Sequence, residues 1–190
     1  MLETIQQFDR DTMSFLQEKL TNESLQDIMV TITRLGDMGA IWLIPGIAML
    51  VTDNRKKDGA QLLLCLGLCG AINSLLIKNI VDRARPFDML HGLEVLIKRP
   101  SDFSFPSGHT ASSFAAAYSL NKTFGKRVGI PAYALATAIG LTRIGVGVHY
   151  PSDVVVGAAV GTAVAMGVTR GMSAFMRLRE KRKKRDKPLD

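Results

Sequence analysis

The chain has 190 residues, of which 47% are hydrophobic, and it carries a formal net charge of +7 at neutral pH. This length is sufficient for one domain with a sizeable core, and we treat residues 1–190 as a single domain. Apolar and charged residues are segregated along the chain, and this pattern disfavours a soluble helical bundle, whose helices should each carry a polar stripe.

The first segment, residues 1–27, is too polar to cross a membrane and lacks the charged-then-apolar order of a cleavable signal peptide. Its apolar residues have helical spacing and predict an amphipathic helix that lies in the membrane interface. These residues are Ile5, Phe8, Met13, Phe15, Leu16 and Leu20. Residues 28–37 are expected to extend the first span outward, with Arg34 and Asp37 near the membrane surface.

Uncharged stretches then follow one another, separated by charged loops. They are residues 38–52, 59–77, 107–120, 128–142 and 154–169. Several of them reach the roughly 20 residues that a span requires only with their polar flanks, but their succession is strong evidence for an integral membrane protein. The sequence therefore predicts an all-α bundle with about five to six transmembrane helices and a core over residues 38–170.

The charge of the loops predicts the orientation of the bundle. Loops 53–58 and 121–127 are basic, and so is the tail at 171–190, mainly in its stretch 177–187. Basic loops stay in the cytoplasm, so loops 79–106 and 143–153 should face outward from the cell membrane. The tail is expected to fix this topology and to attract anionic lipid of the inner leaflet. Nucleic-acid binding is disfavoured, because no aromatic residues interleave with its charges.

Two pairs of small residues, each four positions apart, lie in the expected spans. Cys65 and Cys69 are expected to be buried apolar residues, since two thiols on one apolar helix do not form a disulfide framework. Gly157 and Gly161 form a Gly-x-x-x-Gly pattern, which indicates close helix packing within the bundle or between the protomers of a homodimer.

The stretch FPSGHTASS at 105–113 is open to two interpretations, a Pro-started helix with an incidental histidine or an anion site at a helix start. The other unusual polar residues favour the anion site, because topology places all of them at the same outward-facing membrane boundary. They are Lys78, Arg85, Ser107, His109, Arg143, His149 and Asp153. Three cations without a matching carboxylate cluster suit a phosphate dianion and argue against a metal site. Gly108 lets the backbone approach the phosphate closely.

His149 and Asp153 are four residues apart, and Pro151 between them can start a helix. A carboxylate in the first turn can hold one imidazole nitrogen, which fixes the tautomer and leaves the other nitrogen free to attack phosphorus. His109 is then available to protonate the leaving oxygen, since its unperturbed pKa of about 6.5 suits an acid near neutral pH.

These residues resemble the type-2 phosphatidic acid phosphatases. The family signature is Lys, six residues, Arg-Pro; then Pro-Ser-Gly-His; then Ser-Arg, five residues, His, three residues, Asp. The chain has all three parts at residues 78–86, 106–109 and 142–153, with Thr142 in place of the usual Ser. The resemblance implies a phosphatase without metal or cofactor. It implies His149 as nucleophile, Asp153 as its orienting group and His109 as general acid, with the phosphate held by Lys78, Arg85, Ser107, Gly108 and Arg143.

The same signature occurs in vanadium haloperoxidases, but the uncharged spans and the short chain disfavour that class. A catalytically inactive membrane adaptor should have lost part of the signature, and none is missing. Topology and family favour undecaprenyl diphosphate as the substrate, with phosphatidylglycerophosphate or phosphatidic acid as alternatives. Residues 87–104 are expected to form an amphipathic lip over the site.

Overall fold

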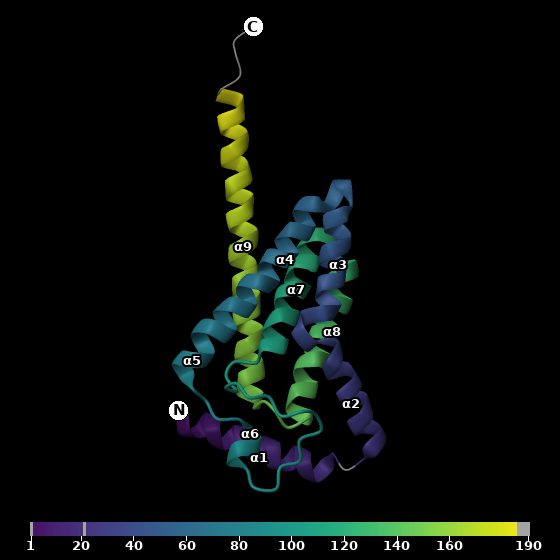
Figure 1. The fold of residues 1–190 in the computed structure, drawn as a ribbon, viewed down its shortest axis with the longest axis vertical. Helices are drawn as coiled ribbons and strands as arrows, with labels where there is room; N and C mark the ends of the chain where they lie inside the picture. The colour runs from purple at the N-terminus through teal and green to yellow at the C-terminus, as the bar shows by residue number, and fades with distance from the viewer. Residues whose placement is uncertain (1, 21, 186–190) are drawn as a thin grey trace.

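The computed structural model of the protein describes residues 2–20 and 22–185, and all regular structure in these ranges is helical, which confirms the predicted all-α fold. Most of the helices run side by side, while α1 crosses one end of the bundle (Figure 1). In chain order they are α1 (Leu2–Lys19), α2 (Glu23–Leu35), η1 (Asp37–Gly39), α3 (Ala40–Val51), η2 (Asp53–Arg55), α4 (Lys56–Ala71), η3 (Ile72–Ile77), α5 (Lys78–Val81), α6 (Pro86–Met89), α7 (Gly108–Phe124), α8 (Lys126–Gly145) and α9 (Pro151–Arg185).

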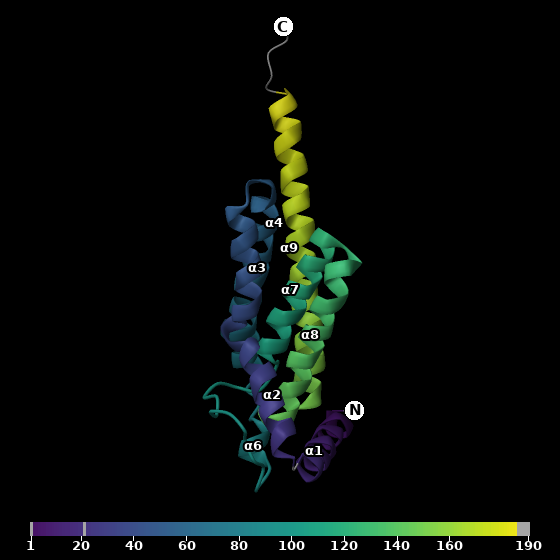
Figure 2. The same cartoon turned by 90° about the vertical axis from the view of Figure 1, so that its right-hand side faces the viewer.

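Helix α7 lies inside the bundle and packs against α4, α8 and α9 (Figures 1 and 2). Its inward residues are small, with Ala111 and Ala115 fully buried, so neighbouring helices approach its backbone closely. A Cβ atom at Gly161 of α9 would lie only 1.9 Å from the carbonyl oxygen of Ala111. The Gly-x-x-x-Gly pattern therefore serves packing within the bundle. Cys65 and Cys69 are buried free thiols, as predicted.

Within the described ranges, three helical stretches are long and apolar enough to cross a membrane: 53–89, 126–145 and 151–183. A fourth candidate is the pair α2 and α3, which is bent by 45° at residue 36. The predicted count of five to six spans is therefore not confirmed. Helix α7 is shorter than these stretches, with 17 residues, and its Thr110, Ser113 and Ser119 are buried in protein.

The basic segments of the chain gather at one end of the bundle. The turn between α3 and α4, the turn between α7 and α8, and the C-terminal half of α9 all point the same way (Figures 1 and 2). The predicted basic tail is helical through Arg185 as a continuation of α9, and residues 186–190 lie outside the described residues. Loops 82–107 and 146–150 lie at the opposite end, beside α1.

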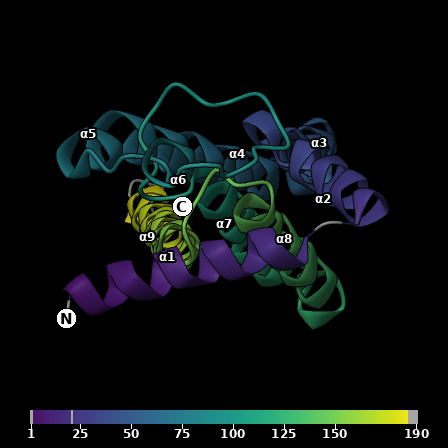
Figure 3. The same cartoon turned by 90° about the horizontal axis from the view of Figure 1, so that it is seen from below.

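Helix α1 lies across that opposite end of the bundle (Figure 3). It covers residues 2–19 only, and α2 begins at Glu23, so the predicted N-terminal segment 1–27 contains the start of a second helix. The apolar residues of α1 do not share one face. Met13 and Leu16 belong to a buried apolar cluster that includes Leu93. Phe8 and Phe15, in contrast, are 62% and 58% exposed.

Candidate active site

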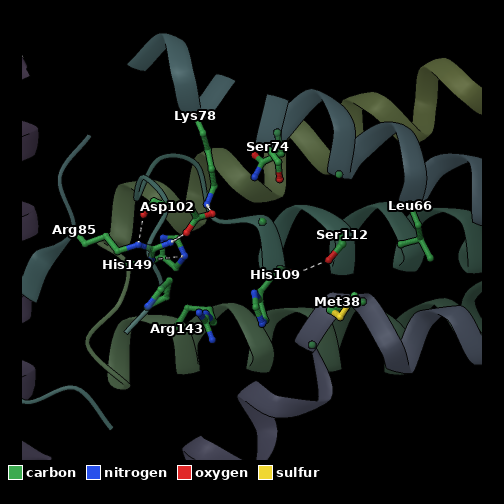
Figure 4. A pocket seen from close by; sticks show the side chains of 16 residues that line it. Met38, Leu66, Ser74, Lys78, Arg85, Asp102, His109, Ser112, Arg143 and His149 are labelled. Carbon is green, nitrogen blue, oxygen red and sulfur yellow. Dashed lines mark hydrogen bonds and ion pairs between the residues drawn. The ribbon is translucent and has the colours of Figure 1, made fainter. Parts of the chain in front are cut away.

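The predicted phosphate site forms at the end of the bundle that carries α1. Six of the eight residues predicted for it line one cavity of about 430 Å³ (Figure 4). The six are Lys78, Arg85, Gly108, His109, Arg143 and His149. They come from α5, the loop before α6, the start of α7, the end of α8 and the loop before α9. The remaining two, Ser107 and Asp153, are fully buried behind the cavity wall.

Ser107 lies at the start of α7 and is fully buried. Ser107 is the N-cap residue, and its hydroxyl oxygen accepts a hydrogen bond from the Thr110 hydroxyl at 2.9 Å. This capping satisfies a backbone N–H at the helix start. Gly108 does line the cavity, and a Cβ atom there would lie 3.2 Å from the Asn73 side chain.

His149 is oriented by the start of α9. Its Nδ1 lies 3.4 Å from Oδ2 of Asp153, and its Nε2 lies 3.4 Å from an Arg85 nitrogen on the cavity side. Burial is the main cause that lowers the pKa of His149 to about 3, with the charges of Arg85 and Arg143 adding to this effect and Asp153 opposing it. The imidazole is therefore neutral at pH 7, and one ring nitrogen keeps a free lone pair.

The three predicted cations are all buried, with at most 5% of any of them exposed. Arg85 is fixed by the backbone, since it donates to the carbonyl oxygens of Val148 and Asp102, each at 2.7 Å. Arg143 donates to the Thr33 hydroxyl at 2.8 Å, while its buried Nε has no hydrogen-bond partner among the described residues. A buried guanidinium group with a spare donor, as Arg143 has, suits an anion that brings several acceptors.

Asp102 completes the site and was not predicted. Its carboxylate accepts hydrogen bonds from Lys78 at 2.5 Å and from Arg85 at 2.6 Å, so it occupies donors that the sequence analysis assigned to phosphate. Burial alone would raise the pKa of Asp102, but the hydrogen bonds and charges of Lys78 and Arg85 outweigh it and lower the pKa to about 2. The sequence analysis expected no carboxylate cluster beside the cations, and Asp102 adds a single carboxylate to them.

His109 also has an acidic partner that the sequence analysis placed at the surface without giving it a role. Its Nε2 lies 2.9 Å from Oδ1 of Asp37, which belongs to the bend between α2 and α3. Gly36 makes this approach possible, because a Cβ atom there would lie 2.9 Å from the imidazole of His109. The signal in the sequence was the Gly-Asp pair inside an otherwise apolar stretch.

Comparison with known proteins places this arrangement in a family. Residues 58–177 match the PAP2 superfamily, which is more than half of the chain and includes the three motifs. The chain belongs to the PAP2 superfamily. Helix α1 and the bent pair of α2 and α3 lie outside the matched residues of this PAP2 protein.

Several relatives of this PAP2 protein are phosphatases by name. Over 92 residues it is 42% identical to decaprenylphosphoryl-5-phosphoribose phosphatase of Mycobacterium tuberculosis, a match that covers 48% of this chain and 49% of that protein. The chain thus spans about half the length of that relative. Over 134 residues it is 32% identical to undecaprenyl-diphosphatase of Bacillus subtilis, which covers 70% of this chain and 67% of the relative.

A solved structure supports the same assignment. The transmembrane PAP2-type phosphatidylglycerolphosphate phosphatase from Bacillus subtilis superposes with a TM-score of 0.74 at 27% identity, covering 90% of this chain and 87% of that one. The apolar spans and this likeness identify a membrane protein. Side chains exposed on the outside of its helices are accordingly apolar, among them Ile44, Ile130, Leu141 and Val155.

Proposed function

We propose that this protein is a lipid phosphate phosphatase that works through a phosphohistidine and needs no metal ion. The observation that carries the proposal is the position of His149, whose Nδ1 faces Asp153 and whose Nε2 faces the cavity beside Arg85. A neutral imidazole held in this way is a competent phosphorus nucleophile. The buried charges of Lys78, Arg85 and Arg143 supply the charge neutralisation that a divalent ion provides elsewhere.

In the first step, Nε2 of His149 attacks phosphorus and the bond from phosphorus to the leaving oxygen breaks. His109 gives its proton to that oxygen. Burial and the charge of Arg143 disfavour the protonated imidazole, and the contact with Asp37 opposes them. Asp153 stabilises the positive charge that develops on His149. In the second step, water attacks the phosphohistidine, His109 takes a proton from this water, and inorganic phosphate leaves.

Substrate entry changes the partners of Asp102. The phosphoryl oxygens take the hydrogen bonds of Lys78 and Arg85 that Asp102 accepts in the free protein. Gly108 and the free N–H groups at the start of α7 hold the phosphate from the other side, and Ser107 contributes to phosphate binding by capping this helix start.

For the substrate we favour undecaprenyl diphosphate, with phosphatidylglycerophosphate and phosphatidic acid as alternatives. A second cavity of about 430 Å³ adjoins the first at His109 and Arg143, on the side of the leaving oxygen. Arg34, Lys98 and Arg99 line this second cavity. Such cations support a leaving group that is itself a phosphate, as in a lipid diphosphate. A relative named undecaprenyl-diphosphatase supports the same choice.

The experiment is an assay of purified protein in detergent with excess chelator against undecaprenyl diphosphate, phosphatidylglycerophosphate and phosphatidic acid. We expect full activity in chelator and the highest kcat/KM on the diphosphate. Replacing Lys98 and Arg99 together with alanine should raise KM for the diphosphate about three- to tenfold, because each exposed ion pair is worth up to about 1 kcal/mol.

The same double variant should leave KM for phosphatidic acid within about twofold, since that substrate has no phosphate on the leaving side. Equal effects on both lipids, or a preference for a monoester, would assign one of the alternative substrates. Activity that disappears in chelator and returns with magnesium would refute the metal-independent mechanism.

We further propose that the site faces outward and that the C-terminus is cytoplasmic. The basic turns and the basic half of α9 share the end of the bundle opposite to the site, which supports this orientation. In a background with Cys65 and Cys69 replaced by alanine, an impermeant thiol reagent applied to intact cells should label His91→Cys and spare Lys183→Cys. Both positions are exposed, so the reverse pattern of labelling would invert the orientation.

A further inference from the structure

Helix α1 places a buried acid next to the candidate active site. Asp9 has no exposed surface, although it lies on a helix that crosses the end of the bundle. Its Oδ2 accepts hydrogen bonds from Arg83 at 2.6 Å and from the Ser152 hydroxyl at 2.5 Å. Its Oδ1 accepts one from the backbone N–H of Ser152 at 3.0 Å. A buried carboxylate is costly unless it is paired in this way, so these contacts fix α1 to the start of α9.

Arg83 connects Asp9 to the proposed orienting residue. Its Nη1 donates to Oδ1 of Asp153 at 2.6 Å, while its Nη2 donates to Asp9. The guanidinium also lies 4.0 Å from the centroid of the Tyr150 ring, which limits its orientation. The other oxygen of Asp153 accepts hydrogen bonds from the Tyr150 N–H and the Ser104 hydroxyl and faces His149 at 3.4 Å. A continuous polar path therefore runs from α1 to the imidazole.

The charges along this path have a consequence for the reaction. Arg83 carries one positive charge, and Asp9 and Asp153 carry one negative charge each, so the cluster keeps one surplus negative charge beside a neutral His149. Paired with Asp153 alone, Arg83 would cancel the charge that the attacking imidazole needs, because His149 becomes cationic as it bonds to phosphorus. Sharing Arg83 with Asp9 leaves Asp153 available to stabilise that cation.

We propose that Asp9 is a positioning residue for catalysis, which holds Arg83 and the start of α9 so that Asp153 stays charged and aligned on His149. This inference rests on the proposed function, and it gives the N-terminal helix, outside the matched family region, a part in the reaction. Asp9 acts through Arg83 and Asp153 and does not line the substrate cavity. Its loss should therefore lower kcat and leave KM nearly unchanged.

The test is a double-mutant cycle with Asp9→Asn, Asp153→Asn and the combined variant, assayed with an aryl phosphate in detergent. We expect Asp9→Asn to lower kcat about tenfold, with KM within twofold of the parent. In the Asp153→Asn background the same change should lower kcat less than twofold, because residues of one network act non-additively. Asp9→Glu, which keeps the charge, should recover part of kcat even where Asp9→Asn folds poorly.

The control is Leu16→Ala, which removes apolar packing between α1 and the bundle without changing a charge. It should lower Tm and leave kcat within twofold. The inference is overturned if Leu16→Ala and Asp9→Asn lower kcat equally at equal loss of Tm. It is also overturned if the effects of Asp9→Asn and Asp153→Asn on kcat multiply in the combined variant. If Asp153→Asn lowers kcat and Asp9→Asn does not, the inference about Asp9 fails while the proposed function stands. If neither substitution lowers kcat, the proposed role of Asp153 fails as well.

Discussion

Replacement of His149 with alanine should reduce turnover by about 10⁴-fold or more, on both lipid and aryl phosphates. His149 lines the cavity with Arg85 beside its Nε2 and with Asp153 on the opposite side of the ring, at its Nδ1. Lys78 and Arg85 are engaged as cations by Asp102 and are poor nucleophiles in that state. The measurement is the initial rate of phosphate release in detergent, with binding of vanadate as evidence that the phosphate pocket is intact.

The chain offers a matched control for this variant. His91 is an exposed histidine in the loop after α6, so His91→Ala should retain the parent rate. A His149→Ala protein that folds, binds vanadate and still turns over within tenfold of the parent would show that another group attacks phosphorus.

Replacement of His109 with alanine should depend on the substrate. A lipid alkoxide or a lipid phosphate needs a proton as it leaves, whereas an aryl oxide is a weak base and leaves without one. General acid catalysis contributes about 10²- to 10⁴-fold, so the loss in kcat on the lipid should exceed the loss on the aryl phosphate by up to that factor. Paired rates on the two substrates, for the parent and the variant, give this ratio directly.

Asp37→Asn provides a second variant for the same assignment. Because Asp37 accepts the hydrogen bond of His109, its loss should disfavour the protonated imidazole and weaken acid catalysis in the same substrate-dependent sense, by a smaller factor. If His109→Ala lowers kcat equally on the lipid and the aryl phosphate, His109 is not the general acid. The neighbouring Arg143 would then be the group to test next.

The sequence predicted the elements that have local or motif signals. Spacing placed Lys78, Arg85, Arg143 and His149 at helix ends on the same side of the membrane, and the structure brings them to one cavity. The start of α9 at Pro151 and the close contact at Gly161 also followed from local patterns. In each case the residue type alone restricts the backbone or the neighbour it can have.

The sequence did not predict contacts between distant segments. Asp102 reaches Lys78 from 24 residues away, Asp37 reaches His109 from 72, and Asp9 reaches Arg83 from 74. Asp9 and Asp102 have no local signal, because they lie in a polar helix and a loop where Asp is common. The Gly-Asp pair at 36–37 marks a bend but does not show that Asp37 reaches His109. The predicted number of spans is not confirmed, since the structure has three to four candidates by length and composition and α7 is enclosed by α4, α8 and α9.

The most direct test of the account is the identity of the residue that carries the phosphoryl group during turnover. The parent protein is mixed with a labelled lipid substrate, quenched in alkaline detergent within one turnover, digested with trypsin and sequenced by mass spectrometry. Cleavage sites between His109 and His149, such as Lys122 and Arg143, place the two histidines on separate peptides. The account predicts a base-stable, acid-labile phosphoryl group on His149. A phosphoryl group on His109 or another residue, or none while phosphate is released, would contradict it.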